Sequence, residues 1–159
     1  MTPGPDVWRP SAYLTLLAVH TAAGALLAVV FPLFQQIVSR SGEPQPLETS
    51  TAVMALAATL ATQGCYWTRR RHMPVAALRG GAVAGHVVMF AGRVSFFFGG
   101  ALFSALFFHH APQLDAPPPP GRAIAKTLGV MTLLFALFCY ALELERFGRA
   151  IEERARKAS

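Results

Sequence analysis

The sequence predicts an all-α integral membrane protein, a four-transmembrane-helix bundle whose last span continues into a cytoplasmic helix. Of its 159 residues, 53% are hydrophobic and only 14% are charged, and this charged fraction is about half that of an ordinary soluble domain. The hydrophobic residues form blocks at about 12–38, 51–68, 81–108 and 124–144. These lengths match the roughly 20 residues that a helix needs to cross a bilayer. Residues 1–159 therefore form a single membrane domain.

The first block, 12–38, follows Pro10 and Ser11, which are typical of a helix start. It is too long for the hydrophobic core of a signal peptide and lacks a convincing small-residue cleavage site, so we assign it as a transmembrane helix. Pro32 lies in its last third. Because proline cannot donate a backbone hydrogen bond, we expect a kink there that neighbouring helices accommodate.

The second block, 51–68, begins after a cluster of helix-capping residues, Thr49 to Thr51. It is rich in alanine and threonine and contains Gln63, which makes its insertion into a membrane less favourable than that of a leucine-rich span. We therefore expect this helix to be covered by the rest of the bundle or by a partner.

The third block, 81–108, is longer than the hydrocarbon core of a bilayer, so it is expected to tilt or to protrude. Gly85, Gly92 and Gly99 recur along it at seven-residue spacing. Small residues let two helix backbones approach closely in a membrane. These three glycines therefore predict a packing interface, within the bundle or with another subunit.

The fourth block, 124–144, runs with no helix breaker except Gly148 into the charged segment 145–159. This segment carries acidic and basic residues at the i, i+4 spacing that stabilises helices: Glu145 and Arg149, Glu152 and Arg156, Glu153 and Lys157. Leu144, Phe147 and Ile151 form a narrow apolar seam along it. We expect a helical tail, and residues 144–158 are a candidate docking segment for a partner.

The orientation follows from the cations beside the blocks. Arg9, the segment 69–79 and the tail carry most of the lysines and arginines, against Arg40, Arg122 and Lys126 on the other side. The positive-inside rule then predicts that both termini are cytoplasmic, in a bacterial inner membrane or, less in keeping with the composition, a eukaryotic organelle membrane. This distribution also accounts for the net charge of +6 without a nucleic-acid partner.

Arg93 is the residue that most needs an explanation, because an arginine at the centre of a membrane helix costs about 2.5–3.5 kcal/mol on insertion. One interpretation is contact with an anion, a lipid phosphate or a substrate. A second is a polar intramembrane layer in which Arg93 meets Gln63 or Glu143. A third is that the helix begins late and Arg93 reaches the cytoplasmic headgroups.

His20 and His86 lie in the cytoplasmic halves of the first and third blocks, and His86 shares a helix face with Arg93. Two histidines at similar depth are what a bis-histidine haem b requires, with an arginine for a propionate. The alternative is that both make ordinary interhelical hydrogen bonds. We expect no metal site, because His109, His110, Cys65 and Cys139 lack further ligands at suitable spacing.

Catalytic signatures such as HExxH, GxSxG and the P-loop are absent from the sequence, so we do not expect an enzyme. The leading hypothesis is a non-catalytic accessory subunit of a multi-subunit membrane complex, with other membrane subunits and lipids as partners. One alternative is a redox protein that binds haem through His20 and His86. Another is a small homo-oligomeric transporter or channel with Arg93 in the path.

Overall fold

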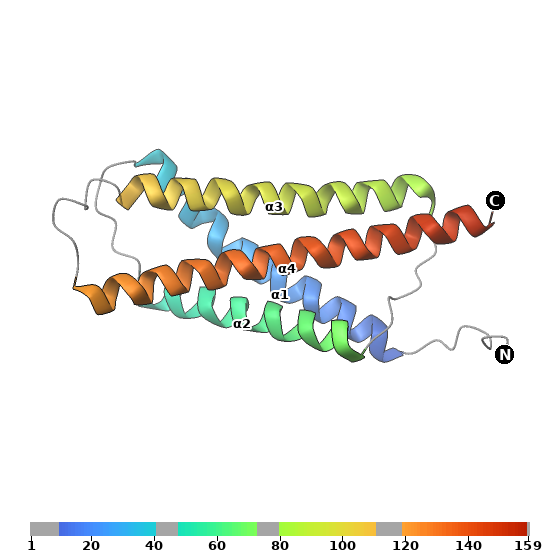
Figure 1. Ribbon diagram of the computed structural model, residues 1–159, viewed down its shortest axis with the longest axis horizontal. Helices are drawn as coiled ribbons and strands as arrows, with labels where there is room; N and C mark the ends of the chain where they lie inside the picture. The colour runs from blue at the N-terminus through green and yellow to red at the C-terminus, as the bar shows by residue number, and fades with distance from the viewer. Residues whose placement is uncertain (1–9, 41–47, 73–79, 111–118, 159) are drawn as a thin grey trace.

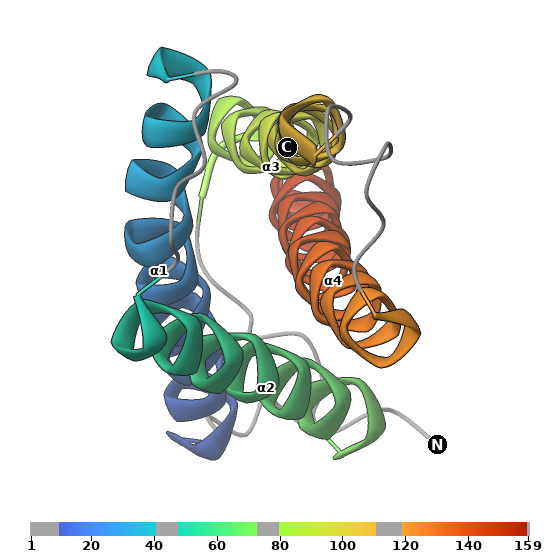
Figure 2. The same ribbon diagram turned by 90° about the vertical axis from the view of Figure 1, so that its left-hand side faces the viewer.

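The computed structural model describes residues 10–40, 48–72, 80–110 and 119–158. These ranges contain four α-helices: α1 (Pro10–Ser39), α2 (Thr49–His72), α3 (Ala82–His110) and α4 (Pro120–Ala158). α1 and α3 run in one direction and α2 and α4 in the other (Figure 1). Seen from its end, the bundle has the helices in the cyclic order α1, α2, α4, α3 (Figure 2).

Three of the described helices are long and apolar enough to cross a membrane, in segments Tyr13–Ser39, Ala82–Leu106 and Pro120–Lys157. α2 has sufficient length but not sufficient hydropathy. The prediction of an all-helical membrane protein is therefore supported for α1, α3 and α4, whereas a bundle of four spans is not confirmed.

α1 and α4 are both longer than the hydrophobic blocks that predicted them. α1 includes Pro32 and continues to Ser39. α4 is a single helix of 39 residues that contains the fourth block and almost all of the charged segment. In that segment Arg149 pairs with Glu145 and Arg156 with Glu152, both at the surface. Exposed pairs of this kind contribute only a few tenths of a kcal/mol each.

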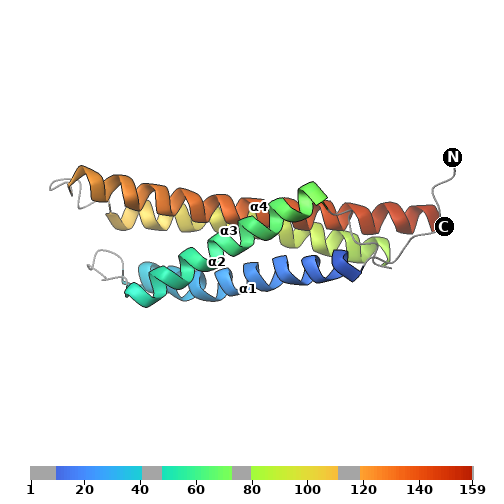
Figure 3. The ribbon, with the colours of Figure 1, turned by 90° about the horizontal axis from the view of Figure 1, so that it is seen from below.

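α3 and α4 lie side by side along most of their length (Figures 1 and 3). The glycines of α3 face α4: a Cβ at Gly85 would lie 2.8 Å from the carbonyl oxygen of Gly148, and a Cβ at Gly92 would lie 3.0 Å from that of Ala141. At Gly99 the approach is looser, with Leu137 at 3.7 Å. These distances show direct backbone contact between the helices at their charged end.

The buried apolar side chains form two clusters. The first joins α1, α3 and α4 near the middle of the bundle and contains Leu26, Val30, Leu102, Ala136 and Leu137. The second lies toward the charged end of α4 and contains Leu16, Phe147 and Ile151, with Tyr13 and Val88 against them.

The second cluster accounts for the apolar seam of the tail. Leu144, Phe147 and Ile151 are only 6–7% exposed, because the seam packs on the protein's own helices. Any docking of residues 144–158 on a partner would therefore use the opposite, charged face of α4.

Candidate functional site

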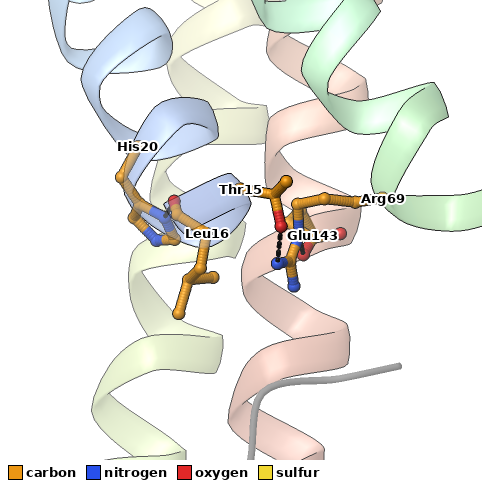
Figure 4. A network of polar contacts seen from close by, with 5 residues as sticks. All are labelled: Thr15, Leu16, His20, Arg69 and Glu143. Atoms are coloured by element: carbon orange, nitrogen blue, oxygen red, sulfur yellow. Dashed lines mark hydrogen bonds and ion pairs between the residues drawn. The ribbon is translucent and has the colours of Figure 1, made fainter. Parts of the chain in front are cut away.

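A buried ion pair between α2 and α4 is the most unusual polar feature of the bundle. The Nε of Arg69 donates to Oε1 of Glu143 at 2.6 Å, and both side chains are only 1% exposed. An Nη1 group of Arg69 also donates to the hydroxyl of Thr15, at 3.3 Å. The three side chains thus join α1, α2 and α4 at one point (Figure 4).

The spacing of residues along α2 explains why Arg69 is buried. The buried positions of this helix are Thr59, Thr62, Tyr66 and Arg69, which follow one another at intervals of three or four residues and so form one helix face. That face is polar and turns toward α1 and α4. The hydroxyl of Thr62 is satisfied within α2 by the carbonyl of Ala58, at 2.8 Å.

The pair is energetically demanding. Removing two charges from water costs several kcal/mol per ion, which mutual attraction repays only when the remaining polar atoms are also satisfied. Oε2 of Glu143 is buried and has no hydrogen-bond partner among the residues that the structure describes. We therefore expect the pair to fix the positions of α2 and α4 relative to each other more than it adds net stability.

His20 lies next to this pair but does not bond to it (Figure 4). Its Nδ1 donates to the carbonyl oxygen of Leu16 at 2.8 Å. Its ring makes edge contacts with Tyr140 and Phe147 of α4, with centroid separations of 5.7 and 6.3 Å. His20 is thus an interhelical packing residue within the described part of the chain.

His86 lies elsewhere. Its side chain is exposed. The residue of α3 that packs against Leu16 and Phe147, beside His20, is Val88. His86 is two residues before Val88 and therefore points about 200° away from it around the helix. The structure therefore does not bring His20 and His86 together, and the arrangement expected for a bis-histidine haem has no support from their positions.

The polar layer expected from Gln63, Arg93 and Glu143 is not formed by those residues. Nε2 of Gln63 donates to the carbonyl oxygen of Thr132 at 3.0 Å, a point on α4 about 16 Å along the helix from Glu143. Arg93 is exposed and has no hydrogen bond or ion pair with residues 10–40, 48–72, 80–110 or 119–158. The counter-charge of Glu143 is Arg69.

Two further predictions concern metal and transport. No group of three His, Cys, Asp or Glu side chains within the described ranges could hold a metal ion, and Cys65 and Cys139 are both free thiols.

Because Arg93 lies on the outside of the bundle, a path lined by Arg93 cannot run through the interior of one chain.

These observations define the class of the protein: an all-helical protein with three helices suited to crossing a membrane and a buried ion pair near one end of the bundle. No protein-family model, curated protein or solved structure matches the chain.

Proposed function

We propose that the protein is a non-catalytic accessory subunit of a larger membrane complex, and that it packs on other transmembrane helices. The observation that carries this proposal is a contrast between two groups of glycines. Gly85, Gly92 and Gly148 are in close contact with a neighbouring helix of the same chain. The second group consists of glycines inside each helix at which an added Cβ would have no described atom within 4 Å, apart from the helix's own backbone: Gly24, Gly64, Gly100 and Gly129.

A glycine inside a helix is destabilising by about 0.5–1 kcal/mol relative to alanine. The first group offsets this cost by letting α3 and α4 approach. For the second group the described residues supply no such compensation, since a Cβ at each position would have no neighbour within 4 Å. Close approach of a helix from another subunit would supply it, as small residues do at membrane helix interfaces. Gly64 is the clearest case, because Ala57 and Ala61 extend the same small, exposed face of α2.

The proposal predicts that Gly64→Leu leaves the fold intact but detaches the protein from its complex. Leucine has a high helix propensity and is favourable in contact with lipid, so the melting temperature of the purified chain should not fall. The mass of the assembly extracted from the native membrane, measured by native mass spectrometry, should drop by whole subunits. Leu56→Met, at an exposed position about 80° around the same helix from Gly64, is the matched control and should keep the full mass. An unchanged assembly with leucine at Gly24, Gly64, Gly100 and Gly129 together would contradict the proposal.

We also propose that α2 is a fourth span, so that both termini are cytoplasmic. Its low mean hydropathy reflects the exposed Arg70, Arg71 and His72 at its end together with polar residues that face inward. Its outward side is apolar, with Val53, Leu56 and Leu60 each more than half exposed. This distribution, polar inside and apolar outside, suits a helix whose surroundings are lipid or other membrane helices.

Cysteine labelling tests the fourth span. In a background without Cys65 and Cys139, Ser50→Cys and His72→Cys place thiols at exposed positions near the two ends of α2. A membrane-impermeant maleimide added to intact cells should modify the thiol at position 50, and that at position 72 only after permeabilisation. Modification of both from the same side would show that α2 does not cross.

A further inference from the structure

Arg93 lies at the depth where the polar end of the bundle begins. A Cβ on the preceding residue, Gly92, would contact Ala141, Leu144 and Glu145 of α4, and these positions span the change of α4 from apolar to charged sequence. The Arg69–Glu143 pair lies at the same level of α4. Arg93, near the middle of the apolar segment Ala82–Leu106, therefore lies level with the point where α4 becomes charged.

The residues next to Arg69 at the end of α2 are typical of the boundary between hydrocarbon and headgroups. Arg70 donates to the hydroxyl of Tyr66 at 2.7 Å and lies over the ring of Trp67 at 5.9 Å. Tyrosine, tryptophan and arginine gather in this way where a transmembrane helix enters the headgroup layer. The end of α2 and the level of Arg93 on α3 therefore belong to one interfacial zone.

The face of α3 around Arg93 is apolar and open. Phe90 and Phe97 are 66% and 73% exposed, and Val94 is 49% exposed. These residues lie on the side of α3 that faces away from Gly85, Gly92 and α4, with Arg93 at the edge of the same surface. We call Phe90, Arg93, Val94 and Phe97 the Arg93 surface. It presents one cation, unpaired within the described residues, among side chains suited to acyl chains.

We propose that the Arg93 surface binds one anionic phospholipid, with the guanidinium of Arg93 on the lipid phosphate and the acyl chains along Val94 and Phe97. A guanidinium matches phosphate oxygens with two parallel hydrogen bonds. The cytoplasmic leaflet, on which the positive-inside rule places this end of the bundle, supplies the anionic lipid.

A lipid fits this surface better than a helix of another subunit. Membrane helices associate through small residues that let backbones approach, and the residues around Arg93 are two phenylalanines and a valine. On α3 a small residue with free space around it is found at Gly100, one helical turn after Phe97. Bulky side chains prevent a second helix from approaching closely, whereas flexible acyl chains can pack against them.

The test is lipid binding by the delipidated protein in a neutral detergent, counted by native mass spectrometry during titration with phosphatidylglycerol or phosphatidylcholine. The wild type should bind one phosphatidylglycerol about tenfold more tightly than phosphatidylcholine, as expected for one charge-assisted contact. Arg93→Gln should lose most of that preference, and Arg93→Lys should keep part of it. Arg71→Gln, at another exposed arginine near the same end of the bundle, should bind as the wild type does.

The remaining outcomes separate the alternatives. Inorganic phosphate at millimolar concentration should not displace the lipid, and displacement would overturn the assignment to a phospholipid. Equal loss in Arg93→Gln and Arg71→Gln would show non-specific attraction and overturn the site. Loss of a co-purifying polypeptide, with lipid binding unchanged, would assign Arg93 to a protein partner instead. A melting temperature of Arg93→Gln far below that of Arg71→Gln would assign it a role in the fold, which the proposal excludes.

Discussion

Glu143→Ala is expected to destabilise the protein by about 3–5 kcal/mol, because it leaves the guanidinium of Arg69 buried without a counter-charge. Arg69 is only 1% exposed, so water cannot replace the lost carboxylate. The measurement is the free energy of unfolding in mild detergent. Glu145→Ala is the control: Glu145 is two residues away and also pairs with an arginine, but that pair is exposed. Its loss should cost no more than about 1 kcal/mol.

A double variant separates the cost of an unpaired charge from the contribution of the pair. Arg69→Met with Glu143→Leu removes both charges and keeps apolar volume between α2 and α4. We expect it to recover most of the stability lost in Glu143→Ala, since buried ion pairs are often no more stabilising than well-packed apolar residues. If Glu143→Ala is as mild as Glu145→Ala, Arg69 is not buried against Glu143 in the folded protein.

The ion pair could not be found from the sequence because hydropathy locates a residue along a helix but not around it. Arg69 begins a run of three arginines after an apolar block, which is the usual pattern of a topology signal. One clue was available: Thr59, Thr62 and Tyr66 precede Arg69 at helical spacing, so the four form one polar face. The same inward face contributes to the low average hydropathy of α2, and composition therefore does not confirm this helix as a span.

Arg93 illustrates a second limit. The third block is longer than the membrane is thick, so either of its ends could protrude, and its midpoint gives no depth. The structure adds the register of α3 on α4, in which Gly92 lies against Ala141 and Glu145 and Arg93 is level with the start of the charged part of α4. That register depends on helix packing, which one sequence does not specify. α3 begins at Ala82, so the helix does not begin late, and the position of Arg93 near the headgroups stays a prediction.

The glycine pattern was more informative. The seven-residue spacing of Gly85, Gly92 and Gly99 predicts that one face of the third block packs closely, and the structure places all three against α4. The spacing does not identify the opposing residue. In the sequence Gly148 is only a helix breaker before the charged segment, whereas in the structure it lies directly opposite Gly85.

Gly148→Ala is expected to destabilise the protein by about 2–3 kcal/mol, in the upper part of the range for an overfilled contact. The added Cβ would lie 2.7 Å from the carbonyl oxygen of Gly85 and 3.0 Å from the amide nitrogen of Met89. Both are backbone atoms, so α3 and α4 must separate, and the ion pair and second apolar cluster near this end would be disturbed. The measurement is again the unfolding free energy in detergent, with helix content checked by circular dichroism.

Gly64→Ala is the matched control, because it makes the same chemical change in the middle of a helix with nothing within 4 Å of the new Cβ. Only the gain in helix propensity applies there, so the isolated chain should become more stable by about 0.5–1 kcal/mol. The same gain acts at Gly148 but is smaller than the cost of separating two backbones. If the two substitutions change the unfolding free energy in the same direction, the contact between Gly85 and Gly148 does not hold α3 and α4 together.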